Sequence, residues 1–267
     1  MELFRHRWQT EHDRKGILVL IHGTGEHHGR YQQLAIYLNQ HGWDVHSGDL
    51  PGWGRSPGLK GHIDAFDQYL ATTDSWVEEA VAESAGQPVF LLGHSLGGLI
   101  VARYTQVYGR AQQLKGAILS SPLLQLKMTV PAWQISLAAL ANRIWPTLRL
   151  HNNLDASMVS RDVEIQQAYL SDPLNYAKVS VRWFFEIQQE MARAWEDRER
   201  FTIPLLVMQA GADQIVDADA VEHFVAGIDQ ADLQWHRFPG LQHEIFNEPE
   251  RQMVYETVVR WLENRTS

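Results

Sequence analysis

A serine lies in a five-residue segment whose composition suits nucleophilic chemistry. Gly93, Ser95 and Gly97 form a Gly-x-Ser-x-Gly pattern between the apolar run Val89 to Leu92 and an apolar helical pattern. A serine on a strained strand-to-helix turn projects its hydroxyl, and flanking glycines let neighbouring backbone pass without a β-carbon clash. The helix N-terminus favours a developing oxyanion. The pattern predicts that Ser95 is a nucleophile; the alternative is an ordinary serine in a tight turn.

An acid that could orient a catalytic base follows later in the chain. In this strand-turn-helix arrangement the partners come in the order serine, acid, histidine, on loops after later strands. Asp213 follows the predicted strand Leu205 to Gln209, whereas Asp217 and Asp219 lie further from the strand end. At that distance, capping the helix that begins near Ala218 is the ordinary role of an aspartate. We therefore expect Asp213 to be the acid.

The base must be a histidine that can swing toward the serine. Three histidines follow Asp213 in the chain: His223, His236 and His243. His223 falls inside a predicted helix and His236 inside a predicted strand, whereas His243 follows the last predicted strand on a loop. A lone histidine is usually structural, but the chain order and the loop position predict that His243 is the base.

Acyl transfer also needs donors for the oxyanion. The loop after the first strong strand runs from His22 to His27 and contains Gly23, Thr24 and Gly25. We expect the backbone N–H of Thr24 to act together with that of Leu96, the residue after the nucleophile.

The sequence predicts neither a cofactor nor a metal ion. The segment Asp49 to Ser56 contains a Gly-x-Gly pattern but lacks the third glycine of a dinucleotide fingerprint, so we interpret it as a structural turn. His27 and His28 are adjacent, and adjacent side chains are expected to diverge. No His-Glu-x-x-His pattern or carboxylate cluster accompanies them in the sequence.

Composition narrows the classes of partner and location. The formal charge is -9, from 23 Lys plus Arg against 32 Asp plus Glu, which disfavours nucleic acid and anionic membranes. Any transient lipid contact should therefore come from apolar side chains. The chain has no cysteine, and its charged start from Met1 to Thr10 has no signal-like apolar run, so we expect a cytoplasmic protein without stable membrane insertion. Oligomeric state is left open.

The elements that must position these residues alternate along the chain. Short strand-like runs are bounded by Gly, Pro or Asn, and helical patterns lie between them, which predicts a mostly parallel, doubly wound α/β sheet. The strands are expected at Ile17 to Ile21, Trp43 to Ser47, Val89 to Leu92, Ala117 to Leu119, Leu205 to Gln209 and Leu233 to Phe238. The helices are expected at Tyr31 to His41, Phe66 to Ala85, Leu96 to Tyr108, Ala218 to Ile228 and Glu250 to Asn264.

The alternation stops between about Leu126 and Phe201, where amphipathic helical segments follow one another without a convincing strand. We predict a core formed by residues 1–125 and 202–267, with a helical cap inserted at 126–201. Pro131 suits a helix start. The residues after it that fall on one apolar stripe are Trp133, Leu137, Leu140 and Ile144. The stripe either packs on the core of the cap or lines a substrate entrance.

Taken together, these patterns resemble the monoglyceride lipase and lysophospholipase branch of the α/β hydrolases, including its bacterial phospholipase-like carboxylesterases. The resemblance covers most of the chain. It depends on His22 to Tyr31, Asp49 to Ser56, Gly93 to Gly97, Ser120 to Pro122, Gly211 to Asp217 and His243 to Glu248. Further similarities lie at Tyr169 to Leu174, Val179 to Trp183 and the stretch from His243 to Arg251.

The resemblance implies an α/β-hydrolase fold with seven or eight strands and a helical cap, because the short N-terminus lacks a full first hairpin. It implies Ser95 as nucleophile, His243 as base, Asp213 as its orienter, and Thr24 and Leu96 as oxyanion donors. By the resemblance Glu26, His27 and Arg30 would bind substrate near the alcohol side of the pocket, and the stripe residues Trp133, Leu137 and Leu140 would bind it if the stripe lines the entrance. The alternative for the first three is a structural pair between Glu26 and Arg30.

The expected activity is hydrolysis of monoacyl esters of glycerol or similar alcohols through an acyl-enzyme, without a cofactor. A lysophospholipid is the second choice of substrate. A peptidase or an acyltransferase could use the same triad, because the nucleophile and the oxyanion hole would be unchanged. Outside enzymes, the alternative is a ligand-binding pseudoenzyme.

Overall fold

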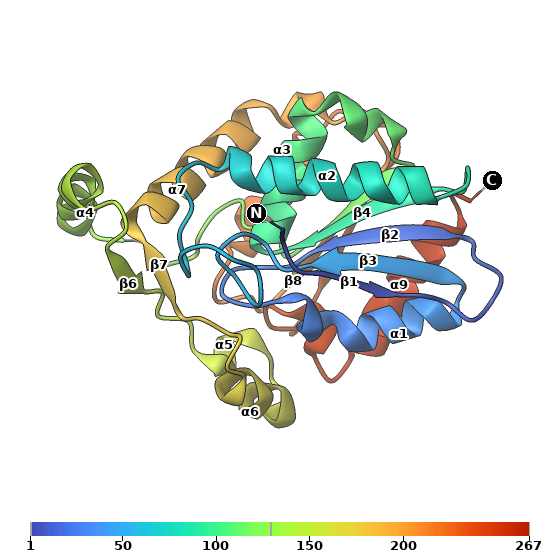
Figure 1. Cartoon of the computed structure of the whole chain (residues 1–267), viewed down its shortest axis with the longest axis horizontal. Helices are drawn as coiled ribbons and strands as arrows, with labels where there is room; N and C mark the ends of the chain where they lie inside the picture. Colours follow the sequence, from blue (N-terminus) through green and yellow to red (C-terminus); the bar gives the residue numbers. More distant parts are fainter. Residues whose placement is uncertain (1, 129, 267) are drawn as a thin grey trace.

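The chain folds around a seven-stranded, mostly parallel sheet. The computed structural model describes residues 2–128 and 130–266, and Figure 1 shows the sheet between layers of helices. The strand order is β1-β3-β2-β4-β5-β8-β9, and only β1 runs antiparallel to its neighbour. The strands are β1 Arg5–Trp8, β2 Gly16–Ile21, β3 Trp43–Gly48, β4 Val89–His94, β5 Gly116–Ser120, β8 Leu205–Ala210 and β9 Leu233–Phe238. The α/β-hydrolase sheet expected from the sequence is confirmed, with the smaller strand number.

Helices bury both faces of this sheet. On one face lie α1 Gln32–Gln40 and α9 Arg251–Glu263, and on the other α2 Asp67–Glu83, α3 Leu96–Val107 and α8 Ala218–Ala226. Because both faces are covered, the central strands are continuous apolar runs: Ile17 to Ile21 in β2 is completely buried. Short 3-10 helices occur at η1 His28–Tyr31, η2 Gly109–Gln113, η3 Arg198–Arg200 and η4 Ile245–Asn247.

Strand β1 was not expected from the sequence. It forms an edge, and its residues are polar or amphipathic with partial exposure in an alternating pattern. Arg5 and Arg7 both pair with Glu79 of α2. Charged side chains on a short edge strand hide the apolar alternation by which a strand is recognised, although they also protect the edge from pairing with another chain.

The described residues of 126–201, called the cap segment below, connect β5 to β8. Figure 1 shows α4, β6 and β7 standing away from the sheet. The elements are α4 Ala132–Ile144, β6 Arg149–His151, α5 Ala156–Val159, α6 Val163–Ser171, β7 Lys178–Ser180 and α7 Val181–Glu196. The expectation that this segment lacks strands is wrong, because β6 and β7 form an antiparallel pair. Three-residue strands are too short to show a period of two. The division into core and cap domains stays a prediction.

Candidate active site

Ser95 occupies a strained turn between β4 and α3. Its φ is 54° and its ψ is −116°, and its backbone N–H donates to the carbonyl of Ser120 at 2.9 Å. A β-carbon on Gly93 would lie 2.1 Å from the carbonyl oxygen of Gly97, and one on Gly97 would lie 2.1 Å from that of Ile21. Both contacts are too short for any side chain. The two glycines are thus required for the tight approach of backbone around the serine.

Asp213 and His243 lie in direct contact. The Nδ1 atom of His243 is 2.8 Å from Oδ2 of Asp213. The other oxygen of this carboxylate, Oδ1, accepts from the backbone N–H groups of Ile215 at 2.8 Å and Val216 at 2.9 Å. With Asp213 completely buried and His243 nearly so, the imidazole is held in one orientation with Nε2 left for another partner.

The same pair shifts both pKa values. Burial alone would raise the pKa of Asp213, but the charge of His243, its hydrogen bond and the two backbone donors together lower that pKa below its ordinary value. Burial would lower the pKa of His243, but Asp213, with smaller effects from Glu244 and Glu26, raises that pKa above its ordinary value. The arrangement therefore stabilises an imidazolium beside a carboxylate.

The alternative acids and bases have other roles in the structure. The side chain of Asp217 caps α8, with Oδ1 accepting from the backbone N–H groups of Asp219 and Ala220 at 3.1 Å each. His223 lies within α8 and His236 within β9. None of these side chains lines the cavity that contains Ser95 and His243.

A cavity of about 400 Å³ brings the candidate groups together. Ser95, His243 and Thr24 all line it. Of the two expected oxyanion donors, Thr24 lines this cavity and Leu96 does not, and neither backbone N–H has a hydrogen-bond partner among the described residues. Much of the remaining wall is apolar and includes Leu123, Leu126, Val159, Val181, Trp183, Phe184 and Ile215.

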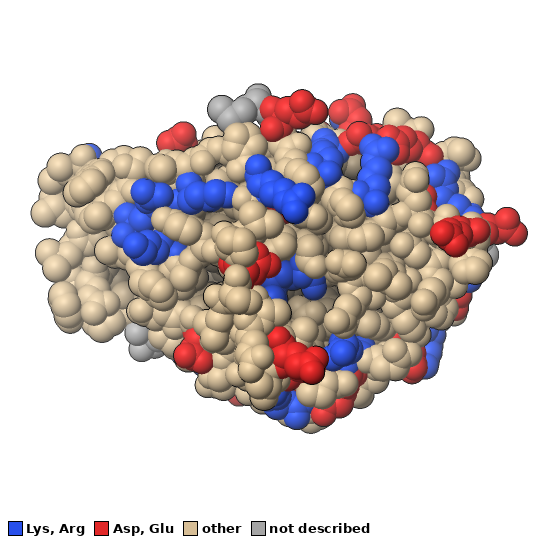
Figure 2. Space-filling model, turned by 60° about the horizontal axis from the view of Figure 1, so that its bottom comes forward, with Lys and Arg blue, Asp and Glu red and all other residues tan. Residues whose placement is uncertain are grey.

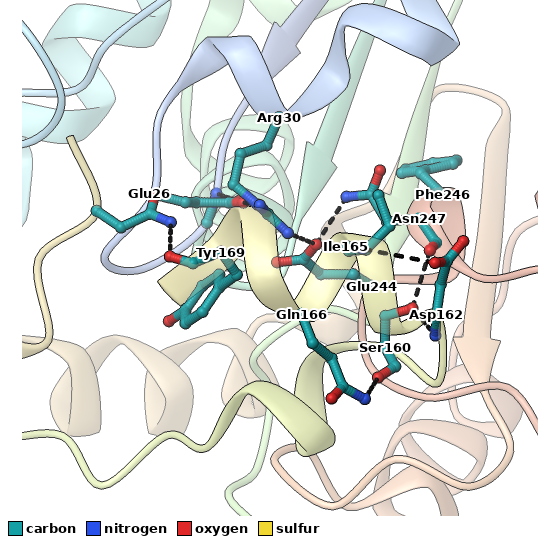
Figure 3. Close-up of polar contacts among 12 residues, drawn as sticks. Glu26, Arg30, Ser160, Asp162, Ile165, Gln166, Tyr169, Glu244, Phe246 and Asn247 are labelled. Carbon is teal, nitrogen blue, oxygen red and sulfur yellow. Dashed lines mark hydrogen bonds and ion pairs between the residues drawn. The ribbon is translucent and has the colours of Figure 1, made fainter. Parts of the chain in front are cut away.

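The polar cluster expected at the alcohol side is only partly exposed to this cavity. Glu26 lines it, as does Glu244, but Arg30 and His27 do not. Figure 3 shows Arg30 between Glu26 and Glu244, where its guanidinium forms a hydrogen-bonded ion pair with Glu244 and lies 3.5 Å from Glu26 Oε2. The guanidinium also stacks over the ring of Tyr169 at 5.0 Å. This placement favours a structural role for Arg30.

Glu26 combines exposure to the cavity with a strong internal anchor. Its Oε1 accepts from the backbone N–H of Gly23 and from the hydroxyl of Tyr31. Burial, followed by the charge of Glu244, raises the pKa of Glu26 above its ordinary value. Glu244 was not expected from the sequence, although it directly follows His243; no local pattern indicates a pairing with Arg30 across 214 residues.

The expectation that the adjacent side chains of His27 and His28 diverge is wrong. Ligand atoms of His27, His28 and Asp49 lie within 4.8 Å of one another. These atoms are nevertheless engaged within the protein: His28 Nδ1 contacts Asp49 Oδ1 at 2.7 Å, and His27 Nε2 contacts Asp172 at 2.8 Å. Asp49 also accepts from the backbone N–H of Arg55 at 2.7 Å. The group is best described as a structural polar cluster.

The apolar stripe of α4 does not line the cavity. Trp133, Leu137 and Leu140 are 64%, 60% and 56% exposed. The residues of α4 that do line it lie on another face and are Gln134, Ile135 and Ala138. The exposure of these side chains does not fit packing on the core of the cap, whereas a place at the substrate entrance stays a prediction. Periodicity identified the apolar face but not what covers it.

Comparison with known proteins finds lipases among the relatives of the chain. The chain is 39% identical to the phospholipase YtpA of Bacillus subtilis over 251 residues, which is 93% of this chain and 95% of that protein. It is 30% identical over 259 residues to a monoacylglycerol lipase of Mycolicibacterium smegmatis, covering 96% and 90% of the two chains. The crystal structure of the Paleococcus ferrophilus monoacylglycerol lipase matches with a TM-score of 0.89 and 35% identity, over 99% and 100% of the chains.

A family model extends the match to most of the sequence. The model described as serine aminopeptidase, S33, matches residues 12–250. Its range includes the Ser95 turn, the acid loop and the His243 loop. The chain therefore belongs to this serine hydrolase family, in the monoglyceride lipase and lysophospholipase branch of the α/β hydrolases, and is a hydrolase of the lipase and esterase type.

Proposed function

We propose that the chain hydrolyses monoacyl esters of glycerol or similar alcohols, with Ser95, His243 and Asp213 as its catalytic triad. The observation that carries the proposal is a strained serine that shares one largely apolar cavity with a histidine bound to a buried aspartate. The names of the relatives, a phospholipase and two monoacylglycerol lipases, support a lipid ester as substrate.

In the proposed reaction, Nε2 of His243 takes the hydroxyl proton of Ser95 while Oγ bonds to the ester carbonyl carbon. The backbone N–H groups of Thr24 and Leu96 stabilise the resulting oxyanion. The bond to the alcohol oxygen then breaks, and His243 returns the proton to that oxygen. Water, deprotonated by the same imidazole, then attacks the acyl carbonyl carbon; the bond to Ser95 Oγ breaks, His243 returns the proton to Oγ, and the fatty acid leaves. Asp213 holds Nδ1–H and stabilises the imidazolium at both stages.

The cavity favours substrates with one acyl chain. Its apolar walls are supplied by both the core and the cap segment, and each buried methylene contributes about 0.8 kcal/mol. A triacylglycerol has two further chains, for which a cavity of about 400 Å³ leaves little room.

We expect kcat/KM for monoacylglycerols to rise with acyl length by up to about fourfold per methylene until the cavity is filled. Triacylglycerols of the same acyl chain should be cleaved at least about tenfold more slowly, because two chains must stay in water or clash with the cap. The measurement is a kcat/KM series below the critical micelle concentration, with acetate esters as the short-chain reference. Equal rates on mono- and triacylglycerols would contradict the one-chain cavity.

A lysophospholipid is the second candidate substrate, favoured by the 39% identity to a protein named phospholipase. Because the family model is described as serine aminopeptidase, a peptidase activity is a further alternative. An acyltransferase is another, and it would differ only in the molecule that accepts the acyl group. A panel of glycerol monoesters, lysophospholipids, aminoacyl amides and added acceptor alcohols separates these activities. A protein that is not labelled by a fluorophosphonate and cleaves none of the panel would instead be a ligand-binding pseudoenzyme.

We further propose transient contact between the outer face of α4 and lipid that presents the substrate. Trp133, Leu137, Leu140 and Ile144 are all more than half exposed, and residues 126–154 contain no Asp or Glu. Figure 2 shows the end of the molecule at the far left almost bare of charged side chains. No described helix is both long and apolar enough to cross a membrane. A cytoplasmic location, expected from the cysteine-free composition, stays a prediction.

The Leu140→Glu variant is expected to bind neutral phospholipid vesicles several-fold more weakly than the parent, because it places a charge on the apolar face. Its kcat/KM on dissolved monoesters should stay unchanged, since Leu140 does not line the cavity. Vesicle co-sedimentation and ester hydrolysis measure the two effects. Met253→Glu, at a 47% exposed apolar residue of α9, is the matched control and should match the parent in both. Equal vesicle binding by all three proteins would remove the proposed contact.

A further inference from the structure

The carboxylate of Asp213 has a side-chain partner besides His243. Gln209, the fifth residue of β8, is completely buried, and its Nε2 donates to Asp213 Oδ2 at 3.0 Å. This is the oxygen that His243 Nδ1 contacts at 2.8 Å. With the two backbone donors on Oδ1, the carboxylate accepts four hydrogen bonds. Gln209 is therefore in direct contact with the atom that would orient the base.

The orientation of the Gln209 amide follows from its surroundings. Its NH2 group meets two acceptors, Asp213 Oδ2 and, at 3.1 Å, the carbonyl oxygen of Ala210. A flipped amide would place Oε1 against both of them and lose both hydrogen bonds. Nε2 must consequently face Asp213.

The carbonyl oxygen of the Gln209 side chain does not stabilise the fold. Oε1 of Gln209 is buried without a hydrogen-bond partner among the described residues. A buried acceptor that lacks a partner destabilises a fold, so a glutamine at this position is unfavourable for stability on that side. An apolar residue of similar length would remove the unsatisfied oxygen. The feature that favours glutamine is the donor aimed at Asp213.

We propose that Gln209 is a positioning residue, which fixes Asp213 Oδ2 so that His243 is held with Nε2 toward Ser95. The inference rests on the proposed triad. A neutral donor serves here because it stabilises the carboxylate without competing with the imidazolium, whereas a cation would lower the basicity of His243. Removing the donor lets the carboxylate move within its remaining hydrogen bonds, so the loss appears in the chemical step and not in substrate binding.

The first experiment is Gln209→Met on the full chain, assayed with a short soluble ester. We expect kcat to fall by about tenfold or more with KM unchanged, because a hydrogen bond to a charged group is lost. The Tm should fall by no more than a few degrees, because removal of the unsatisfied Oε1 partly offsets the lost hydrogen bonds to Asp213 and Ala210. Gln214→Met is the matched control: Gln214 immediately follows Asp213 but is exposed and donates to Gln242, so its variant should keep parental kcat.

The second experiment is Gln209→Glu, which keeps the shape and makes donation depend on a proton. A buried carboxyl beside Asp213 has a raised pKa, so it donates at low pH and ionises as pH rises. The other ionisable groups here are His243 itself, His94 packed on its ring, Glu26 and Glu244, and Lys127, whose Nζ donates to the Asp213 carbonyl. All are shared with the parent. The activity of Gln209→Glu relative to the parent should therefore fall with rising pH, while that of Gln209→Met stays flat.

The outcomes separate this inference from the proposed function. If Asp213→Asn is inactive while folded Gln209→Met keeps parental kcat, the role of Gln209 is refuted and the triad stands. A pH-independent ratio for Gln209→Glu would refute it in the same way, and this variant also serves if Gln209→Met does not fold. If Asp213→Asn is as active as the parent, the triad itself is wrong.

Discussion

Ser95→Ala should abolish ester hydrolysis and covalent labelling by a fluorophosphonate, with a rate loss of several powers of ten. The reason is that the hydroxyl is the proposed nucleophile that forms the acyl-enzyme, and the members of a catalytic triad act as a unit. The side chain of Ser95 is small and makes no capping hydrogen bond to α3, so the fold should keep its Tm to within a few degrees. Rates and labelling are measured on the same preparation, with circular dichroism to confirm folding.

Ser136→Ala is a suitable control for this experiment. Ser136 is an exposed serine of α4 whose hydroxyl donates to the carbonyl of Ala132, and its variant should be labelled and active like the parent. A well-folded Ser95→Ala protein with only a twofold loss would move the nucleophile elsewhere.

The sequence predicted best those features that are local. Gly93, Ser95 and Gly97 can be recognised because one turn imposes a β-carbon limit on both glycines. Asp213 and His243 could be proposed because parallel strands end at one edge of the sheet, so that loops after different strands meet. The six strands expected from apolar runs are all present. The catalytic roles of Ser95, Asp213 and His243 stay predictions until the variants are measured.

What the sequence could not provide depends on contacts between distant segments. Arg30 pairs with Glu244, and neither the charge pattern nor the spacing indicates that partner. The stripe of α4 shows the same limit: the period alone gives an apolar face, but the packing of α4 against α7 decides which face meets the cavity. In the sequence Gln209 looks like an ordinary strand residue, because only the structure shows that its amide donates a hydrogen bond to Asp213.

The choice between two aspartates provides the sharpest test of the acid. Asp213→Asn should lose roughly four powers of ten in kcat, because an amide cannot stabilise the imidazolium and can hold the wrong tautomer of His243. Asp217→Asn should stay within about twofold of the parent, since asparagine caps a helix as well as aspartate does and the Asp217 carboxylate accepts from backbone N–H groups in the first turn of α8.

The pH dependence of activity also distinguishes Asp213→Asn from Asp217→Asn, because only the first variant should shift the profile, and in a known direction. Asp213 holds the pKa of His243 above its ordinary value, and the reaction needs the neutral imidazole, so parental kcat/KM should rise as pH increases through that raised pKa. Without the carboxylate, the imidazolium loses its main partner and its pKa falls. The residual activity of Asp213→Asn should therefore reach its plateau at a lower pH than the parent, whereas Asp217→Asn should follow the parental profile. If Asp217→Asn shows the larger loss and the displaced profile, the acid is Asp217, and the hydrogen bond between Asp213 and His243 is only structural.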